Sequence, residues 1–355
     1  MTIEEKLLRV LREALWGEDS FTNNIERDDV QPLIAEAKKQ TVAGLVIDVL
    51  TRNNVSMDRE TVMQSMLFLQ QVKATNLRVN EALKSFVTIM DEAGMDYLVV
   101  KGQTIAALYP QPLLRTSGDI DFRIKDFETS RQLLAEKWDV HLPETIKEKE
   151  LAFDYQRITF ELHTRLVDFY SKKHQRYWNG IVENDSYTVT VDGVEVRTMS
   201  PTVYAVYVFL HLFFHFIREG VGLRQLCDWA VLMHHWEKEI DKERLAEILS
   251  NVGMTKAYRA FGCILTDSLG LKNFPFDTSK KNHRTGQKIL QEIFRVGNFG
   301  KYDRKGYKGM RFKIETMMRS LRNCIRYLSL SPKELSLFIP KRIWLNIRLG
   351  KQGLV

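Results

Sequence analysis

The sequence predicts an α+β fold, in which a mixed sheet core is flanked by an N-terminal and a C-terminal helical region. Apolar residues recur at helical spacing through most of residues 1–92, whereas short runs with two-residue alternation dominate residues 93–199. Helical spacing resumes after Ser200 and Pro201, a pair that suits a helix N-cap and the first helical position. We therefore expect an N-terminal helical region at 1–92, an α/β core at 93–199 and a C-terminal helical domain at 200–355.

Three helical segments are expected before the core, because apolar side chains that recur every three or four residues line one face of a helix. These segments are Glu4–Leu15, Val30–Val49 and Glu60–Met90. The core then begins with a short β-rich run, Tyr97–Val100, and a sharp turn at Gly102. A short helix is expected from Thr104 to Tyr109, because the prolines that follow would end it.

The next predicted strand carries two carboxylates two positions apart, in the run Asp-Ile-Asp-Phe-Arg-Ile that ends at Ile124. Side chains alternate between the faces of a strand, so Asp119 and Asp121 point the same way while Phe122 faces the core. Two like charges this close repel unless a cation compensates. Mg²⁺ (or Mn²⁺) takes carboxylate oxygens and keeps positions open for substrate phosphates. An edge strand that displays solvated acids is the alternative, but the apolar alternation favours a metal site.

A further alternating segment supplies a third acid. In residues 156–164, Ile158, Phe160 and Leu162 are expected to face inward, while Glu161 and His163 face outward. Three acids on adjacent strands could hold two metal ions about 3.5–4 Å apart, which activates a hydroxyl and stabilises a leaving pyrophosphate. The pattern therefore indicates metal-assisted phosphate chemistry.

The core is expected to end with a hairpin over Tyr187–Arg197, because Asp192-Gly193 is the dipeptide that primed two-residue turns favour. Beyond it, helices are predicted to continue to near Leu330, with a break around residues 270–277.

The Gly102 turn, the Asp119-Ile-Asp121 strand and Glu161 resemble the nucleotidyltransferase superfamily, which has the fold of DNA polymerase beta, poly(A) polymerase and kanamycin nucleotidyltransferase. Four motifs, over roughly residues 75–240, are similar to a bacterial group of uncharacterised nucleotidyltransferases. In order, they are Val100-Lys-Gly, Arg115-x-x-Gly-Asp-Ile-Asp, Phe160-Glu-Leu-His and Leu223-Arg-Gln-Leu-Cys-Asp-Trp. The superfamily turn usually carries a second Gly or a Ser where this chain has Gln103.

The resemblance implies an enzyme with a nucleotidyltransferase-type mixed sheet. Such an enzyme moves a nucleoside monophosphate from a nucleoside triphosphate, such as ATP, to an acceptor hydroxyl or phosphate and releases pyrophosphate. Asp119, Asp121 and Glu161 are then the catalytic residues and the metal ligands. The acceptor is left open between a small molecule, RNA and a protein. The alternative function is a catalytically inactive module of the same fold that binds nucleotide, nucleic acid or a partner protein.

Seven residues around these acids are the expected nucleotide contacts. They are Lys101, Gly102, Gln103, Arg115, Gly118, His163 and Arg224. Lys101 could meet a phosphate or simply extend from a strand end into solvent. Arg115 suits bidentate phosphate binding, or a salt bridge to Asp119. Arg224 and Asp228 lie one helical turn apart, so an ion pair between them is the default interpretation. The resemblance alone implies nucleotide contact by Arg224.

Positive charge is concentrated in one region. The chain has a net charge of +7, yet residues 280–326 contain 14 Lys and Arg against three acids. Such a region could contact nucleic acid, an anionic membrane surface or an acidic partner, or it could be a solvated face.

The other sequence features predict a cytoplasmic protein without a transmembrane segment. The three cysteines show no paired spacing, so neither a disulfide framework nor a zinc knuckle is indicated. The N-terminus lacks the order of a secretory signal. The longest apolar run, Ala205–Ile217, is too short to span a bilayer.

Overall fold

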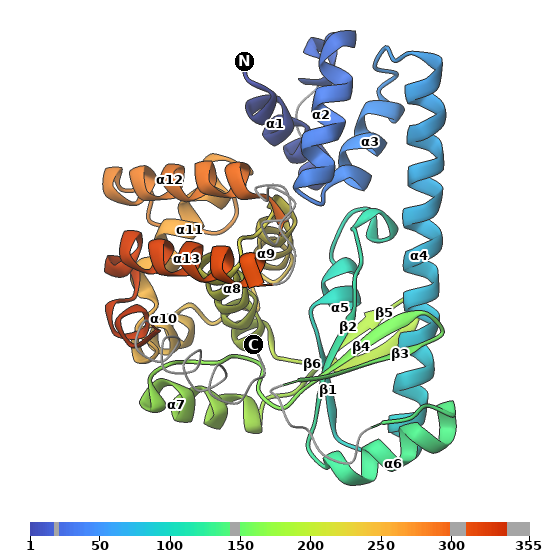
Figure 1. The fold of residues 1–355 in the computed structure, drawn as a ribbon, viewed down its shortest axis with the longest axis vertical. Coiled ribbons are helices and arrows are strands. Elements are labelled where there is room, and N and C mark those ends of the chain that lie inside the picture. Colours follow the sequence, from blue (N-terminus) through green and yellow to red (C-terminus); the bar gives the residue numbers. More distant parts are fainter. Residues whose placement is uncertain (18–20, 143–149, 299–309, 339–355) are drawn as a thin grey trace. The chain divides into compact units, whose positions relative to one another are not determined.

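The computed structural model describes residues 1–17, 21–142, 150–298 and 310–338. The chain divides into two compact units, drawn in Figure 1. The first unit comprises Met1–Lys38, Val42–Leu166 and Asn184–Tyr204. The second comprises Lys39–Thr41, Val167–Glu183 and the chain from Ala205 onward. The N-terminal helices and the sheet core thus belong to the same unit.

The first unit begins with four α-helices. These are α1 (Ile3–Trp16), α2 (Arg27–Lys39), α3 (Ala43–Arg52) and the long α4 (Arg59–Glu92), with a short 3₁₀ turn η1 (Phe21–Asn24) after α1. Thr2 and Glu5 form a capping box at the start of α1, and the side chain of Asp58 accepts the N–H of Thr61 at the start of α4. The predicted helical segments Glu4–Leu15 and Glu60–Met90 are confirmed.

The segment Val30–Val49, predicted to be helical, is divided between two separate helices, α2 and α3. Between them Thr41 adopts a left-handed backbone conformation with φ of 57°. A β-branched residue in that conformation interrupts helical hydrogen bonding. The apolar spacing alone does not reveal this break.

The sheet of the first unit has four strands in the order β1-β2-β4-β3. They are β1 (Tyr97–Val100), β2 (Ile120–Ile124), β3 (Glu150–Tyr155) and β4 (Ile158–His163). Strands β1 and β2 pair antiparallel, β2 and β4 parallel, and β3 and β4 antiparallel. The sheet is therefore mixed, and the predicted α+β fold class is confirmed.

One face of this sheet packs against α4, which extends from the N-terminal helices to the sheet (Figure 1). Phe86 of α4 is fully buried, with its ring 4.7 Å from that of Phe122 and 5.4 Å from that of Tyr97 between centroids. Phe160 also lies in this core. The two-residue alternation of β2 and β4 is confirmed, so the intervening side chains project from the other face.

The link from β1 to β2 contains α5 (Gly102–Ala106) and a 3₁₀ turn, η2 (Pro112–Leu114). Asn76 of α4 is fully buried and donates to the carbonyls of Leu113 at 2.8 Å and Arg115 at 2.9 Å. These bonds satisfy buried backbone groups in the link. The helix that supports the sheet therefore also positions the segment that leads into β2.

The predicted hairpin is confirmed as β5 (Tyr187–Val191) and β6 (Val194–Thr198). Asp192 and Gly193 both have positive φ, 49° and 77°, as a primed two-residue turn requires. A helix, α6 (Phe127–Trp138), follows β2 and contributes Trp138 to the same core as Phe86.

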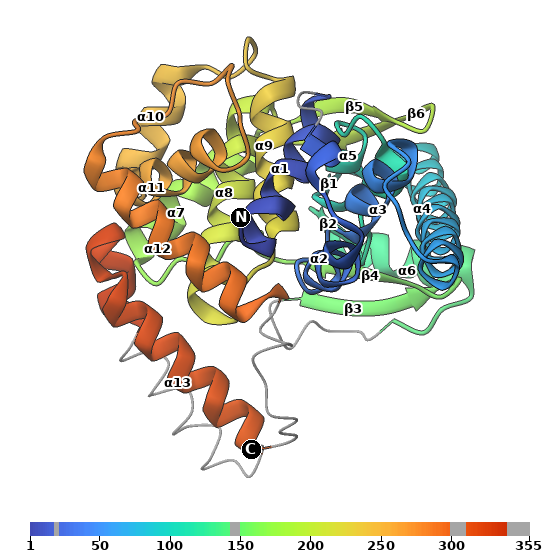
Figure 2. The same ribbon diagram turned by 90° about the horizontal axis from the view of Figure 1, so that it is seen from above.

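The second unit is helical in its described part (Figure 2). Its elements are α7 (Lys172–Glu183), α8 (Pro201–Arg218, of which residues to Tyr204 belong to the first unit), α9 (Leu223–His235), α10 (Lys242–Asn251), α11 (Thr255–Asp267), α12 (Lys280–Val296), α13 (Met310–Arg326) and η4 (Leu328–Leu330). Helix α8 is long and apolar enough to cross a membrane by length and composition, but 83% of it is buried inside the protein. Core helices of globular proteins have the same composition.

The basic region at 280–326 includes α12 and α13, whereas its residues 299–309 lie outside the described residues. Glu292 of α12 is 5% exposed and pairs with three arginines, Arg295 at 2.6 Å, Arg322 at 3.4 Å and Arg326 at 3.2 Å. Burial opposes ionisation of Glu292, but these arginines lower its pKa below the usual value. Part of the positive charge is therefore used to bind α13 to α12.

Phe86→Ala should lower the free energy of unfolding by about 3–5 kcal/mol, because it leaves a cavity between α4 and the sheet. Met66→Ala, at an exposed position of the same helix, should change it by less than about 0.5 kcal/mol. Urea unfolding followed by circular dichroism measures both. Equal stability of the two variants would show that α4 does not form the core described here.

Candidate active site

The parallel pairing of β2 and β4 places two acids side by side. Asp121 lies opposite Glu161 in the register of these strands, and Val100 of β1 lies opposite Asp121 on its other side. Because both acids are one position away from the core residues of their strands, both project from the sheet face opposite α4. The predicted convergence of Asp121 and Glu161 is thus present in the structure.

Asp121 is 3% exposed and has two cationic or polar neighbours. Its Oδ1 lies 2.7 Å from the Lys101 Nζ and 2.7 Å from the His163 Nε2. Burial alone would raise the pKa of Asp121, but the charge of Lys101 and the hydrogen bond of His163 outweigh it and hold the pKa at about 2. Asp121 is therefore ionised at neutral pH despite its burial.

Glu161 completes a group of possible metal ligands. One ligand atom each from Asp121, Glu161 and His163 lies within 4.8 Å of the others, and the His163 Nε2 is 3.7 Å from the Glu161 Oε2. The Glu161 side chain is 27% exposed, so the group opens toward solvent on this side. Carboxylate oxygens suit Mg²⁺ and Mn²⁺, and imidazole is a common ligand of divalent metals. The donor set therefore fits a divalent cation.

The backbone at Lys101 is strained and held by two hydroxyls. Lys101 has φ of 60° and ψ of −151°, a region that non-glycine residues rarely adopt. Its N–H donates to the Tyr204 hydroxyl at 2.6 Å, and its carbonyl accepts from the Thr104 hydroxyl at 2.7 Å. Tyr204 in turn donates to Thr104 at 2.5 Å, because the Thr104 proton is already used. This arrangement fixes the strand end from which the Lys101 side chain reaches Asp121.

Gly102 begins α5 with φ of 49°, and a Cβ added there would lie 3.3 Å from the carbonyl oxygen of Asp119. The turn after β1 therefore runs close to the chain that enters β2, and glycine suits both the conformation and the approach. Asp119 itself is half-buried directly before β2, and Gly118 is exposed. Asp119 precedes Asp121 by two residues in the sequence but does not belong to the trio within 4.8 Å.

Gln103 occupies the position of the second small residue in the superfamily turn, and its side chain is 4% exposed. It bonds toward α4, donating to Asn80 and, at 3.4 Å, to Asn76. Ser117, two residues before Asp119, donates to the Gln103 Oε1 at 2.9 Å and also to Asn76. The Gln103 side chain thus takes part in a buried polar network that connects α4, α5 and the β2 entry.

The other two predicted nucleotide contacts, Arg115 and Arg224, lie in different elements of the structure. Arg115 is 3% exposed in the link before β2, and its charge contributes to the environment of Tyr204. Arg224 lies in the first turn of α9 in the second unit, where its N–H donates to the carbonyl of Gln40 at 3.3 Å. Nucleotide contact by either arginine stays a prediction.

The sequence predicted no role in this site for three of its residues, Tyr204, Thr104 and Asn76. Tyr204 reads as one more apolar position of a core helix, and Thr104 as an ordinary helix residue. Asn76 lies on the core-facing side of a helix. A polar amide at such a position is the sequence signal that could have predicted a buried hydrogen-bond network, because buried polar groups are hydrogen-bonded. Their roles depend on partners distant in the sequence.

The family described as uncharacterised nucleotidyltransferase matches residues 26–269. No curated protein matches the chain. A solved structure, an antigenic nucleotidyltransferase-like protein from Paracoccidioides brasiliensis, is similar at 15% sequence identity with a TM-score of 0.30, over 58% of this chain and 95% of that one. The family match covers more than half of the chain and includes all the acids of the site. The chain therefore belongs to the uncharacterised nucleotidyltransferase family.

Proposed function

We propose that this protein is a divalent-metal-dependent nucleotidyltransferase. It moves a nucleoside monophosphate from a nucleoside triphosphate to an acceptor hydroxyl or phosphate and releases pyrophosphate. The observation that carries the proposal is the register of β2 and β4, which sets Asp121 beside Glu161 on the sheet face away from the core. Family membership supports the reaction class.

Asp119, Asp121 and Glu161 would hold the metal ions, with His163 close enough to join them or to orient Glu161. When bound there, Mg²⁺ or Mn²⁺ supplies charge neutralisation for the phosphates and acidifies an attacking hydroxyl. Glu161, the more exposed acid of the pair, would accept the proton of the acceptor hydroxyl. Asp121 is held ionised by its neighbours, which suits it to ligate rather than to accept a proton.

Lys101, Gly102, Gln103, Arg115, Gly118, His163 and Arg224 are the proposed nucleotide contacts. Lys101 is the best supported, because its ammonium already lies in the site at 2.7 Å from Asp121. The Gln103 contribution would come from its backbone, since its side chain bonds to α4. The acceptor stays open between a small molecule, RNA and a protein, and a cytoplasmic location accords with three buried free cysteines.

A second function, an inactive binding module, is favoured by one observation. Both Lys101 and His163 contact the same oxygen of Asp121, so the carboxylate is compensated by protein groups alone. Calorimetry with a nucleoside triphosphate and Mg²⁺ separates the two functions when combined with a turnover assay. Binding without turnover by any triphosphate would favour the module, as would steeply salt-dependent nucleic-acid binding through 280–326.

Asp121→Asn should reduce transfer of label from an α-labelled triphosphate by more than about a hundredfold, because it removes a charged ligand from the metal group. Asp154→Asn is the matched control, since Asp154 is exposed on β3 of the same sheet and its carboxylate accepts a hydrogen bond from the Thr159 hydroxyl. Circular dichroism verifies folding. Undiminished transfer by folded Asp121→Asn would remove the proposed mechanism.

Lys101→Met should raise the pKa of Asp121 from about 2 toward its usual value. Burial raises this pKa, and the variant removes the Lys101 charge that lowers it. A carboxyl group whose pKa is lower in the folded than in the unfolded protein stabilises the fold at pH values above its unfolded-state pKa. This stabilisation is lost as the pH falls through the folded-state pKa. In the wild type the loss falls between about pH 4 and 2. In Lys101→Met the stabilisation lost should be smaller, and the loss should be complete at a higher pH. Carboxyl carbon NMR titration measures the pKa.

Lys125→Met is the control for that titration, because Lys125 pairs with Asp96 at a solvent-exposed position. It should leave the Asp121 titration unchanged. A shift of equal size in both variants would mean that overall charge, rather than the Lys101 contact, sets the Asp121 pKa.

A further inference from the structure

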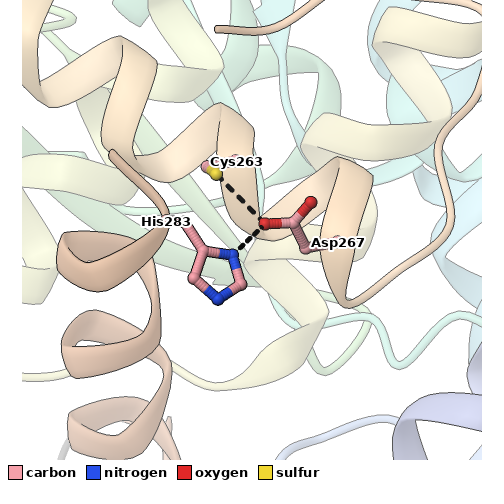
Figure 3. A group of neighbouring side chains, drawn as sticks. All are labelled: Cys263, Asp267 and His283. Atoms are coloured by element: carbon pink, nitrogen blue, oxygen red, sulfur yellow. Dashed lines mark hydrogen bonds and ion pairs between the residues drawn. The ribbon is translucent and has the colours of Figure 1, made fainter. Parts of the chain in front are cut away.

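A second group of metal-ligating side chains lies in the helical unit. Cys263 and Asp267 of α11 and His283 of α12 converge, as Figure 3 shows. The Cys263 Sγ is 3.1 Å from the Asp267 Oδ2, and the His283 Nδ1 is 2.7 Å from the same oxygen. One ligand atom of each residue lies within 4.8 Å of the others. Sulfur, nitrogen and oxygen donors thus meet at one point.

Helix geometry and one glycine bring the three side chains together. Cys263 and Asp267 are four residues apart on α11, so they share one face of that helix. His283 lies in the first turn of α12, three residues before Gly286. A Cβ added at Gly286 would lie 3.0 Å from the carbonyl oxygen of Ala260 and 3.6 Å from the Cys263 Cβ. The close approach of α12 to α11 at Gly286 therefore holds His283 against the other two ligands.

The group is buried on one side and open on the other. Cys263 is 1% exposed, whereas the side chains of Asp267 and His283 are 26% and 50% exposed. Burial, the hydrogen bond to Asp267 and the charges of Asp267 and Asp277 raise the pKa of the Cys263 thiol to about 12. Without a metal, the thiol therefore keeps its proton and donates it to Asp267. An ion can enter from the histidine side.

We propose that Cys263, Asp267 and His283 bind one zinc ion, with water as the fourth ligand. Thiolate, imidazole and carboxylate are the zinc donors of proteins, and the thiolate selects against Mg²⁺. Bond lengths of about 2.3, 2.0 and 2.1 Å at tetrahedral angles place sulfur about 3.6 Å and nitrogen about 3.4 Å from the carboxylate oxygen. The present separations of 3.1 and 2.7 Å require small outward shifts of less than about 1 Å.

The binding step is an exchange of a proton for a metal. Zn²⁺ forms a bond to the Cys263 sulfur, the thiol S–H bond breaks and its proton goes to solvent, without any oxidation or reduction. The bound ion cross-links α11 to α12. This site is independent of the nucleotidyl-transfer proposal, because it lies in the other unit and His283 falls beyond the family match at residue 269.

Cobalt titration of the full, chelator-treated chain tests the site, because cobalt occupies zinc sites and gives a thiolate charge-transfer band only when sulfur is a ligand. We expect a near-ultraviolet band that saturates at one equivalent, is lost on addition of Zn²⁺ and is accompanied by release of one proton. Cys263→Ser should abolish the band. His283→Ala should weaken Co²⁺ binding at least about tenfold.

Two variants serve as controls. Cys324→Ser removes another buried cysteine of the same unit, and Asp121→Asn alters the acidic group of the first unit. Both should keep the band. Absence of a band in the folded wild type, or a band that persists in Cys263→Ser, would overturn the proposal. If Cys263→Ser does not fold, the test rests on His283→Ala, because the His283 side chain is half-exposed. A cobalt affinity of His283→Ala equal to that of the wild type would overturn the proposed site.

Discussion

The parallel pairing of β2 with β4 is the constraint on which the candidate active site depends. It sets Asp121 opposite Glu161, and strand alternation then sends both acids to the face away from α4. A shift of one residue in this register would turn Asp121 toward the core and Phe122 toward solvent. The aromatic core around Phe86 opposes such a shift, so packing on one face specifies the chemistry of the other.

Asp121 illustrates how a buried charge is retained. Its burial favours the neutral acid, and an unpaired carboxylate there would take up a proton. The Lys101 ammonium prevents this, and Lys101 reaches Asp121 from a strained strand end that Tyr204 and Thr104 hold by hydrogen bonds. Strain in the backbone at Lys101 is thus maintained by surrounding contacts, as is common at functional sites.

The faces of β2 and β4 and the positions of Asp121 and Glu161 follow from two-residue alternation, so they could be predicted from sequence. Asp119 lies before β2 and outside the ligand trio, so alternation along the strand does not place it. The hairpin turn at Asp192-Gly193 was predictable for a similar reason, because its conformation is local. The interaction of Tyr204 with Lys101 joins residues about a hundred positions apart, and no local pattern encodes it. The burial of the Gln103 side chain was not predictable either, because it depends on hydrogen bonds to Asn76 and Asn80 of α4. Helical periodicity identifies these two residues only as polar positions.

Under the proposed function, the Lys101–Asp121 pair links metal binding to nucleotide binding. Asp121 and Glu161 would share a bound divalent ion, whose charge would compensate the carboxylate that Lys101 now compensates, so the attraction between Asp121 and the Lys101 ammonium would weaken. A largely buried ammonium then requires another anion, which a triphosphate supplies. Each ligand thereby lowers the cost of binding the other, and such coupling is reciprocal. The ion pair that compensates Asp121 in the free protein is therefore compatible with activity.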